Sequence, residues 1–137
     1  MLITTEGLTH LNDVSVHGTT PVSPWYVGLI SSTGWSALAA ADTLASHAGW
    51  TEEIPTTAAL RLAWVEGAAA AGVTTSSATT DFAIISSATI KGYFLASAAS
   101  GTSGTLLGAM LFSEGDRAVV SGDTLQVTVT LTATTTA

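Results

Sequence analysis

The feature that most constrains this chain is a strict alternation of side chains near its end. In Thr124–Thr132, leucine or valine occupies every second position, and threonine or glutamine occupies the positions between them. Successive side chains of a β-strand point to opposite faces, so the pattern predicts a strand with one apolar face and one face of hydroxyl groups. The side chains expected to face the core are Leu125, Val127, Val129 and Leu131.

Other short apolar runs, rich in branched and aromatic residues, are also typical of strands. Turn residues such as "SSTG", "SGTSG" and "SGD" separate them at roughly the 8–12-residue spacing of antiparallel sandwiches. We therefore expect an all-β, antiparallel, jelly-roll-like sandwich of about seven or eight strands with one short helix. Besides the alternating segment, the expected strands are Trp25–Ile30, Leu60–Gly67, Asp81–Ser86, Ala88–Ser97, Thr105–Ser113 and Arg117–Val120.

The helix is expected at Thr43–His47, because the Asp42 carboxylate can cap its first turn and Gly49 can end it. The polar, weakly patterned segment 1–23 predicts an extended N-terminal arm, with at most one short strand near Asp13–His17. Residues 24–137 are then expected to form a single β-domain.

Three of the four tryptophans fall within Pro24–Glu53, in a stretch that suits either a ligand pocket or a packing core. Large aromatic side chains are more often buried in cores than used as ligand platforms, so we interpret them as core. The full predicted core is Trp25, Val27, Leu29, Trp35, Trp50, Trp64, Phe82, Ile84, Phe94, Leu125, Val127, Val129 and Leu131.

Charge is scarce: 9% of the residues are charged, against about 25% in ordinary domains. The net charge is −7, and only three residues are lysine or arginine, so nucleic acid and anionic membranes are not expected as partners. Threonine, alanine and serine make up 62 of the 137 residues. A surface of hydroxyls and methyls loses little when another protein covers it, because few charges must be desolvated.

No residue pattern predicts catalysis or a bound cofactor. The chain has no cysteine, no Gly-x-Ser-x-Gly motif and no phosphate-binding loop, and its histidines are too dispersed to indicate a metal site. Glu52 and Glu53 are adjacent, so on a strand they point to opposite faces and cannot share a cleft. We expect no enzyme activity, no metal, no cofactor and no membrane span, and no classical secretion signal at Met1–Gly7.

The segments "PWYVGLISSTGWSALAAADTLASHAGWTEE", "RLAWVEGAA", "IKGYFLAS" and "GTLLGAMLFSEGDRAVVSGDTLQVTVTLTA" occur in this order and span roughly Trp25–Ala133. In that order the chain resembles the capsid cement, or decoration, proteins of short-tailed bacteriophages, such as that of a Bordetella phage. The resemblance implies a jelly roll that binds the outside of an assembled shell and reinforces it. The implied partner is the major capsid protein, and the implied location is the exterior of the virion, after synthesis in the host cytoplasm.

Self-association is also expected, as a dimer rather than a trimer, because two-fold contacts are the commonest. We expect capsid or oligomer contacts at Leu2, Ile3, Leu8, Leu11, Val14, Thr128, Thr130 and Thr132, and the terminal "TATTTA" is a further candidate. The alternative function is a receptor- or glycan-binding module of a tail fibre, which would need an exposed pocket.

Overall fold

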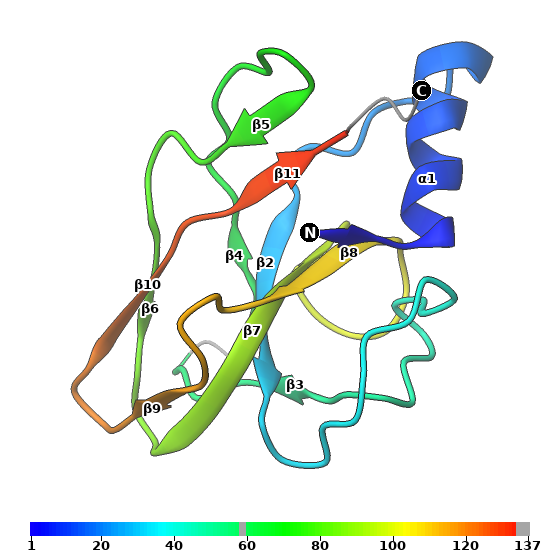
Figure 1. Cartoon of the computed structure of the whole chain (residues 1–137). Coiled ribbons are helices and arrows are strands. Elements are labelled where there is room, and N and C mark those ends of the chain that lie inside the picture. The colour runs from blue at the N-terminus through cyan, green and yellow to red at the C-terminus, as the bar shows by residue number, and fades with distance from the viewer. Residues whose placement is uncertain (58–59, 134–137) are drawn as a thin grey trace.

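The computed structural model describes residues 1–57 and 60–133, and its described strands pair antiparallel (Figure 1). In chain order the elements are β1 (Leu2–Ile3), α1 (Thr5–Asn12), the π-helical turn η1 (Asp13–His17), β2 (Tyr26–Ser31), β3 (Glu52–Glu53), β4 (Leu62–Ala63), β5 (Val73–Thr75), β6 (Thr80–Ala83), β7 (Ala88–Ala96), β8 (Leu106–Leu111), β9 (Arg117–Val119), β10 (Thr124–Val127) and β11 (Thr130–Thr132).

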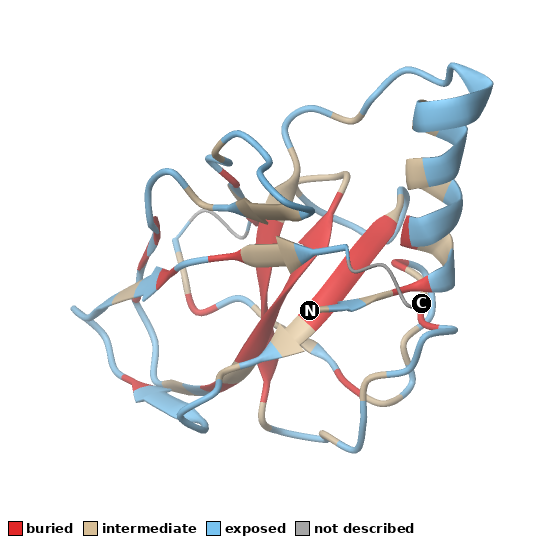
Figure 2. Ribbon diagram, turned by 45° about the horizontal axis from the view of Figure 1, so that its top comes forward, coloured by how far each residue is buried: buried red, intermediate tan, exposed pale blue. Residues whose placement is uncertain are grey.

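The main sheet has the strand order β1-β8-β7-β2-β3, with β4 also pairing with β2 and β9 with β7. Its central strands β2, β7 and β8 are buried over most of their length, as the red ribbons of Figure 2 show. Both faces of these strands are covered, which is why their sequences are nearly continuous apolar runs rather than alternating ones. The packing leaves no room for a side chain at Gly28, since a Cβ there would lie 2.2 Å from the Phe94 ring.

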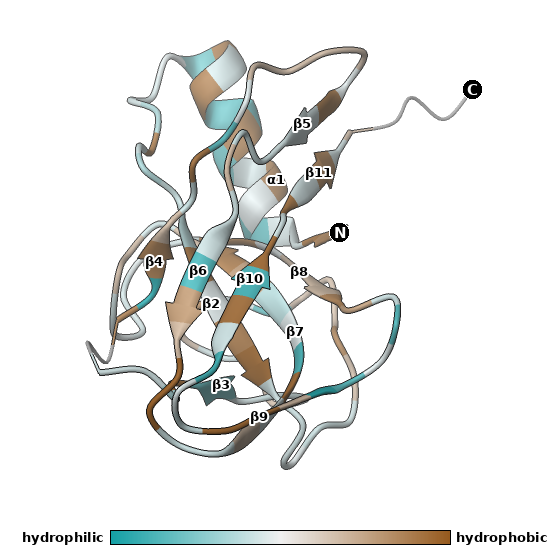
Figure 3. Ribbon diagram, turned by 90° about the vertical axis from the view of Figure 1, so that its left-hand side faces the viewer, coloured by the Kyte–Doolittle hydropathy of each residue, from teal (hydrophilic) through white to brown (hydrophobic). Residues whose placement is uncertain are grey.

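Two small two-stranded sheets, β6–β10 and β5–β11, pack on one face of the main sheet. Figure 3 shows β6 and β10 in front of β2 and β7. The predicted long alternating strand is divided between these two small sheets, β10 pairing with β6 and β11 with β5. Its alternation is nevertheless retained: Val127 and Val129 are fully buried, while Gln126 and Thr128 are exposed.

The loop of residues 32–50 covers the other face of the main sheet, where Leu44 and Trp50 pack with Phe94. The predicted helix at Thr43–His47 is wrong, because this loop contains no helix. The Asp42 carboxylate has other partners: it accepts hydrogen bonds from Trp50 Nε1 and from the Ala39 amide, both at 2.9 Å. The buried indole therefore takes the acceptor that the sequence suggested as a helix cap.

The short helix lies instead in the segment expected to be an extended arm, and this prediction is also wrong. Residues 2–17 form β1, α1 and η1, and β1 pairs with β8 through Leu2 and Ala109. Thr4 caps α1 by accepting from the Gly7 amide at 3.0 Å. Asp13–His17, expected as a strand, continues the helix as a π-helical turn.

The N-terminal segment is attached to the sheet by hydrogen bonds and by close packing of its helix. The Glu6 carboxylate accepts from the Leu106 amide at 2.6 Å and from the Leu44 amide at 3.1 Å. A Cβ on Gly7 would lie 2.2 Å from the Leu107 carbonyl oxygen, so the helix packs directly against the backbone of β8. Removal of residues 1–12 would therefore expose core, not merely detach an arm.

The fold class is all-β with antiparallel sheets and one short α-helix, as the sequence predicted. The described residues contain eleven strands, more than the seven or eight expected, because several have only two or three residues. The jelly-roll connectivity stays a prediction. Of the predicted core residues, four are half-buried and pack at the margin of the two buried clusters: Trp25, Trp35, Leu125 and Leu131. The others are buried: Val27, Leu29, Trp50, Trp64, Phe82, Ile84, Phe94, Val127 and Val129.

Candidate binding groove

Hydrogen bonds join the two layers of the sandwich along the side where β4 and β5 lie. The Gly67 amide donates to the Thr75 carbonyl at 2.7 Å, and the Ser77 amide donates to the Val65 carbonyl at 2.9 Å. Trp64 Nε1 adds a side-chain bond to Ser76 Oγ at 2.8 Å. This side of the molecule is closed.

The opposite side is open, between the end of β8 and the strands β10 and β11. Two adjoining depressions of about 400 Å³ and about 180 Å³ lie there and share Phe112, Ser113 and Thr128. We call them together the groove. It is lined by Tyr93, Met110, Leu111, Phe112, Ser113, Glu114, Arg117, Leu125, Gln126, Val127, Thr128 and Thr130.

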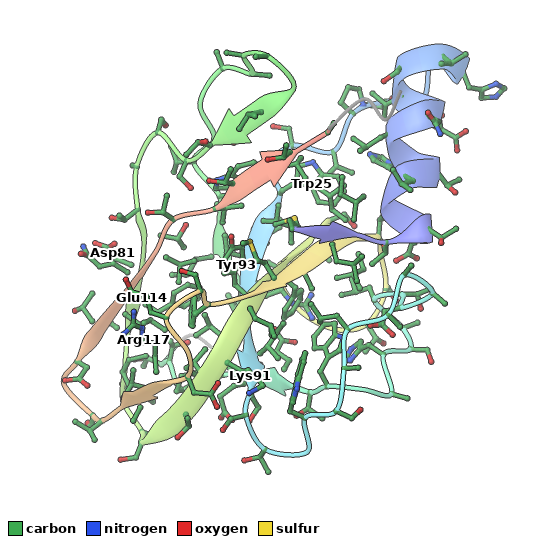
Figure 4. All side chains as sticks on the ribbon, viewed as in Figure 1. Trp25, Asp81, Lys91, Tyr93, Glu114 and Arg117 are labelled. Carbon is green, nitrogen blue, oxygen red and sulfur yellow. The ribbon has the colours of Figure 1, made fainter. Side chains whose placement is uncertain are left out.

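Tyr93 forms part of the groove wall and connects its two sides (Figure 4). The side chain is 5% exposed, and its hydroxyl donates to Met110 Sδ at 3.4 Å and contacts the backbone of Thr130. Burial raises the pKa of Tyr93 above its ordinary value of 10.0, and the hydrogen bond with the Thr130 backbone opposes that rise. The phenol is therefore a neutral bridge between β8 and β11 at physiological pH.

The charged groups of the groove are paired. Arg117 forms an ion pair with Glu114, and Gln126 donates to the Asp81 carboxylate at 3.3 Å. Figure 4 labels Asp81, Glu114 and Arg117, which lie on the side of the molecule where β6, β9 and β10 lie. The other two basic residues of the chain, Lys91 and Arg61, are paired with Asp116 and Glu52. The groove is thus lined by apolar, hydroxyl and amide side chains together with one ion pair, and it holds no unpaired cation.

The structure brings only two of the predicted contact residues together in the groove, Thr128 and Thr130. Thr132 is exposed further along β11. The N-terminal residues lie on β1, α1 and η1: Leu2 and Leu8 are exposed, whereas Ile3, Leu11 and Val14 are half-buried. Of the terminal "TATTTA", residues 134–137 lie outside the described part of the chain.

Met110 and Gln126 received no contact role from the sequence, which favoured a core role for the aromatic residues Tyr93 and Phe112. Nothing local distinguishes them from core or surface positions of a strand. They meet only because β8 and β10 face each other across the open side, which is a consequence of long-range pairing.

The residues considered for catalysis or metal binding have structural partners. The His47 ring stacks on Trp50 with 3.9 Å between centroids, and His10 meets Trp25 edge-on at 5.4 Å. Glu52 binds Arg61, and Glu53 accepts from Ser31 Oγ at 2.8 Å. Within residues 1–57 and 60–133, no three acidic or histidine side chains gather as metal ligands would. None of the described helices has the length and apolar character of a membrane span.

The chain matches no protein-family model, and no curated protein shows significant similarity to it.

Proposed function

We propose that this protein is a structural virion protein that binds the outer surface of an assembled phage capsid and cements neighbouring major capsid subunits. The observation that carries the proposal is the groove itself. It is an open depression between strand edges whose two charged residues, Glu114 and Arg117, neutralise each other, on a molecule with few charged residues.

The surface chemistry supports contact with protein. Each of the three lysine and arginine side chains is already paired with a carboxylate of the same chain. An anionic polymer or lipid surface would have to displace these pairs, whereas a neutral protein surface would not. The exposed threonines beside the groove offer hydrogen bonds without the cost of desolvating a charge.

The mechanism follows from mass action. A protein that binds the assembled shell, and not the separated subunits, lowers the free energy of the assembled state alone. At a free concentration of about 100 times the dissociation constant, each copy contributes about 2.7 kcal/mol. Many copies on one shell would oppose the outward pressure of packaged DNA.

A receptor- or glycan-binding module of a tail fibre is the second candidate, and one observation favours it. The larger depression places Phe112 beside the polar groups of Glu114, Arg117 and Gln126. An aromatic surface with neighbouring donors and acceptors suits a sugar ring.

The two functions are separated by binding the purified full chain to two targets. One is the empty shells of the phage that encodes the chain, and the other is intact cells of its host. Co-sedimentation with shells, together with a higher temperature of shell disruption, is the expected result. Binding to cells but not to shells would establish the alternative.

A further inference from the structure

The backbone of β8 offers an unused edge next to β1. The Phe112 amide donates to the Lys91 carbonyl of β7, so Met110 and Gly108 direct their backbone groups toward β7, as far as the register shift opposite Leu95 and Ala96. Leu107 and Ala109 point to the other side, where the Leu107 carbonyl accepts from the Thr4 amide and Ala109 pairs with Leu2. The next outward residue is Leu111, and no strand among the described residues pairs with it on that side.

The facing wall of the groove also offers a strand edge. The Val129 carbonyl accepts from the Ser76 amide, so Thr128 and Thr130 direct their backbone groups away from β5. The Thr130 backbone is already hydrogen-bonded to the Tyr93 hydroxyl, so the main edge position on this strand is Thr128. On β10, the Asp123 carbonyl accepts from the Ile84 amide, and the same alternation turns Gln126 away from β6. All three outward residues line the groove.

The groove therefore continues the line of β1 along β8. In the β1–β8 register, Leu2 is opposite Ala109 and Ile3 is opposite Gly108, so a strand following the same line beyond Met1 would reach Leu111. Figure 1 shows β1 beside one half of β8, with its N-terminal end directed toward the other half. The opposite edge from Gln126 to Thr130 would span about five residues of such a strand at about 3.3 Å per residue.

The lining determines the chemistry of the occupant. Unpaired strand edges bind extended peptides through main-chain hydrogen bonds, and the side-chain pockets provide selectivity. Here the pockets are formed by Met110, Phe112 and Leu125, and the rim charges Glu114 and Arg117 neutralise each other. A charged side chain in the segment would be desolvated without a partner.

We propose that the groove accepts an extended, uncharged segment of about five residues from a capsid subunit, which adds as a strand between β8 and β10–β11. The identity of the partner rests on the proposed function. The site and its mode of binding rest on the strand edges alone.

The test removes one hydrogen-bond donor from the edge. Leu111→Pro deletes the outward amide and no bond of the β7–β8 ladder, whereas Leu111→Ala keeps the amide and shortens the side chain. Circular dichroism and the slow exchange of the Phe112 amide check that both variants are folded. We expect Leu111→Pro to weaken binding to empty shells about tenfold and Leu111→Ala to weaken it less than about twofold.

A second experiment needs no capsid. The probe is the blocked peptide Thr-Val-Thr-Val-Thr at millimolar concentration, and the control probe carries lysine at its third position. We expect the neutral peptide to slow hydrogen exchange of the Leu111 and Thr128 amides at least about tenfold, and the lysine peptide to leave it unchanged.

The outcomes are distinguishable. If the wild-type chain does not bind shells but the neutral peptide protects both amides, the capsid function fails and the strand site stands. If shells bind Leu111→Pro and wild type equally and the peptide protects neither amide, strand addition is wrong even though the capsid function survives.

Discussion

At the scale of single residues, the few charges of this chain are used inside the molecule. Arg61 is 6% exposed, and its guanidinium donates to both carboxylate oxygens of Glu52, at 2.8 and 2.7 Å. It also donates to the carbonyls of Ala98 and Gly101 and lies 5.1 Å from the centre of the Phe94 ring. One side chain thus holds β3 and the loop after β7 against the core.

Replacing Arg61 by methionine removes this set of bonds and leaves Glu52 without its partner. We predict a loss of about 3 kcal/mol in the free energy of unfolding, measured by urea denaturation. The matched control is Arg117→Met, whose exposed pair with Glu114 should contribute less than about 1 kcal/mol. Equal losses in the two variants would show that burial does not set the contribution of Arg61.

The buried Tyr93 should make the folded protein less stable as the pH rises into the alkaline range. Its pKa is raised because burial penalises the phenolate, so the folded protein holds this proton more tightly than the unfolded chain does. The resulting stabilisation is complete below pH 10.0, the unfolded value, and is lost as the pH rises through the higher pKa of the folded state.

We therefore predict that Tyr93→Phe loses less stability than wild type between about pH 9 and about pH 11. Urea denaturation at the two pH values measures the difference. Identical losses in the two proteins would mean that Tyr93 does not carry the alkaline dependence.

At the scale of elements, the N-terminal helix is part of the folded sheet and not a free arm. Glycine inside a helix normally weakens it by about 1 kcal/mol relative to alanine. At Gly7 the sign should reverse, because the added methyl group would collide with the Leu107 carbonyl of β8.

We predict that Gly7→Ala lowers the melting temperature, with a cost of about 1–3 kcal/mol. Thr9→Ala, an exposed position on the same helix, should change stability by less than about 0.5 kcal/mol. If Gly7→Ala raised the melting temperature, helix propensity would outweigh docking and the segment would behave as a loosely attached arm.

The sequence predicted elements best where packing imposes a period. The alternation from Leu125 to Leu131 and the apolar runs of β2, β7 and β8 gave the all-β fold, because burial of one or both faces leaves a direct trace in the residues. The helix was misplaced because Asp42 has two competing uses, and its carboxylate binds the Trp50 indole. Thr4 with Ile3 and Leu8 around it was the available helix signal, since apolar residues on both sides of an N-cap often pack together.

No comparable pattern in the sequence indicates the groove. Leu111 becomes an open edge only because β1 covers Gly108 and Ala109 and no further residue of β8. Thr128 and Thr130 were chosen for their hydroxyls, while the property that matters in the structure is the direction of their backbone groups. That direction follows from pairing with β5 and β6, which no local pattern encodes.

At the scale of the whole molecule, hydrogen bonds join the two layers of the sandwich along one side, and the other side is open. A second surface is apolar: Ile54, Leu60 and Ile85 are each more than 40% exposed, and the Ile85 amide bonds to the Pro55 carbonyl. Such a surface suits self-association, and it shares no residue with the groove.

We predict a dimer in sedimentation velocity at micromolar concentration. Ile85→Lys should shift the protein to the mass of one chain, because it places an unpaired charge in the contact. The exposed and more distant Val16→Lys is the control and should remain dimeric. A monomeric wild-type protein would remove the expected dimer without affecting the groove.

Electron cryo-microscopy of the phage particles tests the central claim most directly. The account predicts copies of this sandwich on the outside of the shell, with the face containing Tyr93, Phe112 and Thr128 against a capsid subunit and an extra strand beside β8. Particles without this protein on the shell, or copies bound with that face directed to solvent, would contradict it.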